Sequence, residues 1–183
     1  MYRYILSLGL VFLTSCTLPG TQTESTDISE NTVPIEINGV SMDVPRTWSW
    51  VTESHTITPK KGALIMTYVS PDVQSGFSNN LVVLRDTLST IMTSDKYSVL
   101  NNLQTQKNYL EYTLKKESII TFADNEVSRV YTFRAKYNEN TPVLQYVQTA
   151  RVCGTSVYLI HFTLTLDKKA ELYTKLLESF TCK

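Results

Sequence analysis

The side chains best suited to chemistry in this 183-residue chain are its three cysteines and two histidines, His55 and His161. They and the carboxylates are not grouped at spacings that bind a metal ion. A Gly-x-Ser-x-Gly elbow and a glycine-rich phosphate loop are both absent from the sequence. His161 alternates with Leu159 and Thr163, so we expect it to be a hydrogen-bonded residue of a sheet. We therefore predict no catalytic residue, no metal and no cofactor, and a protein that is not an enzyme.

Cys16 ends an N-terminal segment in which Arg3 precedes an apolar run, residues 5–13, and two small residues, Thr14 and Ser15. This order is typical of a secretory signal peptide. The run is too short to span a bilayer, which needs about 20 helical residues. A cysteine directly after the small pair resembles the lipobox of bacterial lipoproteins, and the resemblance implies cleavage before Cys16 and acylation of Cys16. The alternative is an N-terminal strand or helix of the core.

The rest of the chain divides into a tether and one domain. We expect a signal peptide over residues 1–15, an acylated Cys16 with a Ser/Thr-rich flexible linker over residues 16–32, and a single domain over residues 33–183. The protein would be anchored to the cell membrane by lipid and face the extracytoplasmic side, in the periplasm or at the cell surface. The chain has 17 basic and 17 acidic residues, which argues against nucleic acid as a partner.

Acylation of Cys16 leaves one pair of cysteines, Cys153 and Cys182, in an exported and therefore oxidising setting. Cys153 precedes a predicted strand over residues 156–166, and Cys182 ends a helix predicted to return along that strand. This arrangement brings the two cysteines together, so we predict a disulfide between them. The alternative is two partly buried thiols.

The periodicity of apolar residues predicts an α+β domain. Asn38-Gly39, between alternating apolar residues, indicates a hairpin. A helix that starts after Ser94 or Ser98 and ends near residue 109 has one apolar stripe. Four strands are predicted over residues 113–122, 127–137, 143–152 and 156–166, and their short connections favour an antiparallel meander. Asp167 is the expected N-cap of a last helix.

The strand over residues 156–166 is apolar on both faces, which implies cover on both sides and predicts an α/β/α sandwich. This pattern resembles the PsbP-like fold family. The residues that carry the resemblance lie in four segments: 41–48, where a strand ends in Pro45 before Trp48, then 145–150, 158–164 and 177–180. The family has no shared catalytic residues, so the resemblance implies a fold and no site.

Aromatic residues are the strongest indication of recognition, because they supply contact area at low entropic cost. Trp48 and Trp50 are two residues apart, and with Phe77 they are our candidate binding surface; the alternative for the tryptophans is core packing. We predict that the domain binds or scaffolds an unidentified component of the cell envelope, a protein or a small ligand. The alternative is an envelope hydrolase of a type without a recognised motif.

Overall fold

The computed structural model describes residues 31–51 and 62–183. Cys16, with the rest of the predicted signal and most of the linker, lies outside the described residues, as does His55. The elements of the described chain, in order, are β1 (Thr32–Ile37), β2 (Val40–Pro45), β3 (Ser49–Trp50), β4 (Ala63–Gln74), β5 (Phe77–Thr87), α1 (Ser94–Asn108), β6 (Leu110–Thr121), β7 (Val127–Lys136), β8 (Leu144–Cys153), β9 (Ser156–Leu164), α2 (Ala170–Glu178) and β10 (Thr181–Cys182).

The predicted hairpin at Asn38-Gly39 is confirmed. Strands β1 and β2 pair antiparallel with Ile37 opposite Val40, so two residues form the turn. Asn38 and Gly39 both have positive φ angles, 50° and 77°. This is the backbone that a two-residue hairpin turn requires, and asparagine and glycine are the residues that adopt it most readily. Strand β10 pairs with the other edge of β2 and completes a three-stranded sheet.

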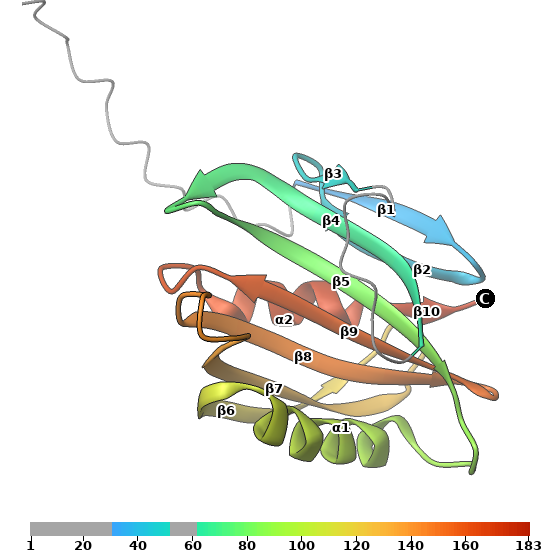
Figure 1. Ribbon diagram of the computed structural model, residues 1–183. Coiled ribbons are helices and arrows are strands. Elements are labelled where there is room, and N and C mark those ends of the chain that lie inside the picture. The colour runs from blue at the N-terminus through green and yellow to red at the C-terminus, as the bar shows by residue number, and fades with distance from the viewer. Residues whose placement is uncertain (1–30, 52–61) are drawn as a thin grey trace, which may run out of the picture.

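The larger sheet has seven strands in the order β3-β4-β5-β9-β8-β7-β6, and all its neighbouring strands are antiparallel (Figure 1). The predicted meander of four strands is confirmed as β6 to β9. Strand β5 pairs with β9 and not with β6. The chain therefore leaves β5 in the middle of the sheet and reaches the far edge through α1, which lies across the outside of β7 and β8 (Figure 1).

The two helices lie on opposite faces of the large sheet, as the α/β/α prediction requires. On β8, Gln148 accepts a hydrogen bond from Thr105 of α1, 3.3 Å between oxygens. The preceding residue, Val147, packs in the cluster that contains Leu176 and Leu177 of α2. Successive side chains of a strand point to opposite faces. The domain is thus an α+β fold with one helix on each side of an antiparallel sheet.

Each face of the sheet carries its own core. The face under α2 holds the main core, and Phe162, Leu164 and Phe180 are among its fully buried side chains. The face under α1 holds a smaller cluster at the C-terminal end of that helix. This second cluster is aromatic: Phe133 and Tyr146 stack with ring centroids 4.9 Å apart. Tyr109, the C-cap of α1, packs edge-on to both of these rings.

Helix α1 does not pack through its apolar stripe. Its buried residues are all polar, Ser94, Ser98, Asn102 and Thr105, whereas Leu100 and Leu103 are 49% and 50% exposed. The sheet below supplies hydrogen-bonding groups instead of apolar surface: Ser98 donates to the carbonyl of Arg129 at 2.6 Å. Polar contacts that pair fully are compatible with burial, which explains why this helix is held by its polar face.

The helix and strand ends differ in detail from the predictions. The N-cap of α1 is Thr93, whose side chain accepts from the amide of Lys96, and not Ser94 or Ser98. The N-cap of α2 is Lys169, which makes no side-chain cap hydrogen bond, and not Asp167. Cys182 lies in β10, beyond the end of α2. These differences move boundaries by a few residues and leave the order of elements unchanged.

Candidate functional site

A cleft of about 300 Å³ lies between α1 and the part of the sheet formed by β5 and β9. Helix α1 packs on β7 and β8, so its side wall stands above β9 and β5. The cleft is lined by residues of the two strands, of α1 and of the chain just before β4: Gly62, Leu84, Arg85, Asp86, Tyr97, Leu100, Asn101, Gln104, Val157 and Leu159.

The floor of the cleft is apolar. Leu84 and Leu159 are directly opposite each other on β5 and β9, and Val157 precedes Leu159 by two residues on the same face. Gly62 lies at the rim with a φ angle of 76°, and a Cβ atom there would come within 2.6 Å of the carbonyl oxygen of Arg85. Only glycine fits this close approach, so Gly62 allows the chain to border the floor.

The wall of the cleft is one side of α1. Tyr97, Leu100, Asn101 and Gln104 are spaced three and four residues apart, which places them on one side of the helix. Burial and the nearby negative charge of Asp86 raise the pKa of Tyr97. Its hydroxyl therefore stays protonated at neutral pH and can donate a hydrogen bond, as the amides of Asn101 and Gln104 can.

A row of side chains crosses the same face of the sheet next to the floor. Thr67 is opposite Val82, Val82 is opposite His161, and His161 is opposite Gln148. The Oγ1 atom of Thr67 and the Nδ1 atom of His161 are both buried, and neither has a hydrogen-bond partner among the described residues. The predicted hydrogen bond of His161 is therefore missing at Nδ1. Burial lowers its pKa to about 4, so the ring is neutral at pH 7.

The lining of the cleft is better suited to binding a ligand than to a reaction that needs a paired acid and base. The acid and base that line the cleft are Asp86 and Arg85, both exposed at its rim. Among residues 31–51 and 62–183, no three His, Cys, Asp or Glu side chains are close enough to hold a metal ion. An apolar floor with a few hydrogen-bonding groups along one wall is the usual construction of a small-molecule site.

The structure does not bring the three predicted aromatic binding residues together. Trp48 is half-buried and its ring packs on Phe162 and Tyr173 of the main core, at 5.9 and 6.1 Å. Trp50 is 43% exposed and lies edge-on to Tyr68 at 5.4 Å. Phe77 packs against the aromatic cluster on the opposite face of the sheet. A binding role for any of the three stays a prediction.

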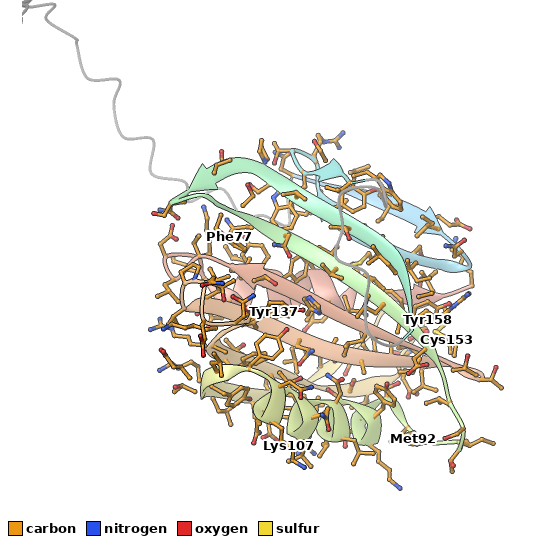
Figure 2. The ribbon with its side chains drawn as sticks, in the orientation of Figure 1. Phe77, Met92, Lys107, Tyr137, Cys153 and Tyr158 are labelled. Atoms are coloured by element: carbon orange, nitrogen blue, oxygen red, sulfur yellow. A yellow bond between two sulfur atoms is a disulfide. The ribbon has the colours of Figure 1, made fainter. Side chains whose placement is uncertain are left out.

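The predicted cysteine pair is supported. Cys153 and Cys182 are joined through their sulfur atoms, with Cα atoms 5.9 Å apart. Cys153 ends β8, and Cys182 pairs with Val40 of β2. The bridge thus connects the large sheet to the small one. In Figure 2 it lies at the opposite end of the molecule from Phe77 and Tyr137.

Some residues of the cleft and of the polar row beside it are recognisable in the sequence, although local patterns do not assemble them into a site. Thr67 and His161 are polar residues within otherwise apolar strands, and such interruptions are a reason to look for a functional group. Tyr97, Asn101 and Gln104 share a side of α1 by simple helical spacing. Their meeting with β5 and β9 depends on the pairing of β5 with β9, which local patterns do not encode.

The fold is that of an α+β domain of PsbP-like type. Neither a protein-family model nor the sequence of any curated protein matches the chain. Solved structures that are similar include the cyanobacterial PsbP, CyanoP, of Synechocystis sp. PCC 6803, with a TM-score of 0.57, 12% identity and coverage of 84% of this chain and 93% of that one. A protein of unknown function from Pseudomonas aeruginosa is also similar, with a TM-score of 0.54, 11% identity and coverage of 84% and 98%. Identities this low establish the fold alone.

One further observation concerns the membrane. In the described part of the chain, neither helix has the length and apolar character needed to cross a bilayer.

Proposed function

We propose that this protein is a lipid-anchored component of the bacterial cell envelope that binds a small ligand, or a short part of an envelope partner, in the cleft beside α1. The observation that carries the binding role is the cleft itself, which combines the apolar pair Leu84 and Leu159 with hydrogen-bonding groups of Tyr97 and Gln104. Its volume of about 300 Å³ is at the lower end of the range for ligand sites, which favours a small occupant.

The sequence before the domain supports the proposed location. Cys16 follows an apolar run and two small residues, and two acyl chains on such a cysteine would give stable anchoring. The bond between Cys153 and Cys182 fits a protein exported to an oxidising compartment. A Ser/Thr-rich segment of about 17 residues would hold the domain roughly 20–25 Å from its anchor, which leaves the cleft open to envelope components.

The anchor is tested by mass spectrometry of the protein extracted from its native membrane. We expect a mature N-terminus at Cys16 that carries acyl chains, and a Cys16→Ser variant that leaves the membrane fraction. An intact Met1, or cleavage at another residue without lipid, contradicts the proposed location.

The cleft is tested by site-specific photo-cross-linking in native membranes. Gln104 lines the cleft, whereas Gln106, two residues further along α1, is exposed, outside the lining and on a different side of the helix, so benzoylphenylalanine is placed at each position in turn. We expect a cross-linked species from position 104 that is absent from position 106 and that disappears when Leu159→Glu places a charge on the floor. The same products from both positions, or products that survive Leu159→Glu, contradict a binding role for the cleft.

A further inference from the structure

We propose that the cleft binds a small-molecule amine, with the ammonium group beside the carboxylate of Asp86 and the apolar body on Leu84 and Leu159. This inference rests on the proposed function, because it names the chemical class of the ligand for the same cleft. Asp86, Leu84 and Leu159 all line the cleft, so the ligand needs no space beyond it.

The carboxylate of Asp86 lies on the same face of the sheet as the apolar floor. Asp86 follows Leu84 by two residues on β5 and is opposite Val157 of β9, so its side chain shares a face with both. Two residues along a strand span about 7 Å. A ligand whose apolar body covers the leucines can therefore place an attached ammonium group beside the carboxylate.

The charge on the cleft face is negative. Arg85 also borders the cleft, but it lies between Leu84 and Asp86 on β5 and is opposite Tyr158, so its side chain points to the other face of the sheet. Tyr158 belongs to the main core on that other face. The atom of Arg85 that Gly62 approaches is the backbone carbonyl oxygen. Among the described residues that line the cleft, Asp86 thus carries the only charge on the cleft face.

Tyr97, on the wall of the cleft, lies near Asp86. The negative charge of Asp86 acts on the hydroxyl of Tyr97 and, after burial, is the second cause that raises its pKa. In the described part of the chain, no hydrogen bond joins the two side chains, and Oδ1 of Asp86 accepts from the amide of Thr87 at 2.8 Å. The other carboxylate oxygen is left for a ligand. An ammonium group there would donate to that oxygen and to the hydroxyl of Tyr97, or lie against its ring.

The rest of the lining limits the rest of the ligand. Leu84, Leu159 and Leu100 offer apolar surface, and Asn101 and Gln104 offer uncharged amides. An anion would be repelled by Asp86 and would find no cation on the cleft face. The cleft of about 300 Å³ is at the lower end of the range for ligand sites, which favours a free amine with one or two rings over a folded partner.

Three probes with the same aromatic body separate the effect of charge from the effect of the apolar floor. At pH 7.5, 2-naphthylmethylamine is a cation, 2-naphthylmethanol is neutral and 2-naphthoate is an anion. We expect the amine to bind the full-length protein about three- to fivefold more tightly than the alcohol, because an exposed ion pair contributes up to about that factor. We expect 2-naphthoate to bind most weakly. Fluorescence titration in a nonionic detergent gives the three affinities.

Variants of Asp86 test the assignment through the ratio of two probes on one protein. Asp86→Asn should lower the preference for the amine over the alcohol toward one, and Asp86→Lys should reverse the order of the amine and 2-naphthoate. Asp72→Asn is the matched control, because it removes the same charge from an exposed position outside the lining. It should leave the ratio unchanged. A variant that only alters stability does not move the ratio, and the detergent affects all the proteins alike.

Three results would overturn the inference: the alcohol binding as tightly as the amine, a preference for the amine that survives Asp86→Asn, or an equal loss of preference in Asp72→Asn. The species cross-linked from position 104 gives a further test, because a product enlarged by a whole protein chain would contradict a small-molecule ligand. If the cross-link persists while any of the three results is found, the cleft binds a ligand of another class. If the cross-link and all probe binding are absent, the proposed binding function fails as well.

Discussion

Arg151 of β8 and Asp124 of the turn between β6 and β7 form an ion pair, with 2.6 Å between Nη2 and Oδ2. The side chain of Arg151 is 9% exposed, and its guanidinium also donates to the carbonyl of Val152 at 2.7 Å and lies over the ring of Phe122 at 5.5 Å. The hydroxyl oxygen of Ser94, the first residue of α1, accepts from the guanidinium of Arg151 at 3.5 Å and from the amide of Val152 at 2.9 Å. This one arginine thus ties a turn, a strand and the start of a helix together.

Removing the acid of this pair should destabilise the domain. Burial raises the pKa of Asp124, but the hydrogen bond and the charge of Arg151 outweigh it and lower the pKa overall. In the described part of the chain, Asp124→Ala leaves a nearly buried guanidinium whose remaining ion pair is the longer one with Glu126, at 3.7 Å, so we expect a loss of about 2–3 kcal/mol. Urea unfolding measures it. Asp72→Ala, an exposed control, should change stability by less than about 0.5 kcal/mol; an equal loss in both variants would contradict the role of the pair.

The histidine of the polar row should make stability depend on pH. The folded pKa of His161 is about 4, below the ordinary value of 6.5, so the unfolded chain binds the extra proton between these two pH values. Stability is therefore complete above about pH 7 and falls as the pH drops toward 4, by up to about 3 kcal/mol. The two residues opposite His161 on the neighbouring strands, Val82 and Gln148, do not titrate. Urea unfolding at pH 7.5 and 4.5 should show a smaller acid loss in His161→Leu, and equal losses would refute the prediction.

The sequence predicted the parts of this fold that local patterns determine. Alternating residues on β6 to β9 and the Asn38-Gly39 turn identified strands and a hairpin, because side-chain period and turn geometry are local. The pairing of β5 with β9 was beyond such patterns, since it depends on contacts about 75 residues apart in the chain. The cleft depends on that pairing, so its residues were not predicted as a site even though each was visible.

Local patterns also could not predict which side of α1 packs on the sheet. Hydrophobic spacing identifies the apolar stripe with Leu100 and Leu103. The sheet below α1, however, presents two hydrogen-bond acceptors, the backbone carbonyl of Arg129 and the side-chain amide oxygen of Gln148. The polar residues of the helix satisfy these groups, and so they are buried in place of the leucines. A periodicity argument assumes an apolar partner surface, and here the partner surface is polar.

Because α1 packs on the sheet through its polar side, we expect substitutions of its polar residues to cost more stability than substitutions of its leucines. Leu103→Lys removes a leucine that is 50% exposed, so we expect a change in unfolding free energy of less than about 0.5 kcal/mol. Ser98→Val removes one of two donors to the carbonyl of Arg129, which keeps the hydroxyl of Thr149 at 2.9 Å, so we expect a loss of about 1 kcal/mol, the usual net effect of one hydrogen bond. Thermal and urea unfolding of both variants test this. A larger loss from Leu103→Lys than from Ser98→Val would mean that the apolar stripe holds the helix.

The disulfide should act as a clamp between the two sheets. It closes a loop with a sequence separation of 29 residues, and in the chain-entropy model such a loop contributes about 3–4 kcal/mol. Strand β10 has only two residues paired with β2, and the amide of Lys183 donates to the carbonyl of Gly39 at 2.9 Å. A pairing of two residues gives little independent stability. We therefore expect the attachment of β10 to depend on the disulfide.

We therefore expect the Cys153→Ser/Cys182→Ser variant to lose stability and to release β10 before the rest of the sheet unfolds. Hydrogen exchange should show faster exchange at the amide of Lys183, while the amides of β8 and β9 in the centre of the sheet stay protected. Reduction of the wild-type protein with dithiothreitol should reproduce both effects. Alkylation of Cys153 without reductant would show that the bond does not form in the exported protein. An unchanged exchange rate at Lys183 in the variant would show that β10 is held by its own pairing, because the clamp would then contribute nothing local.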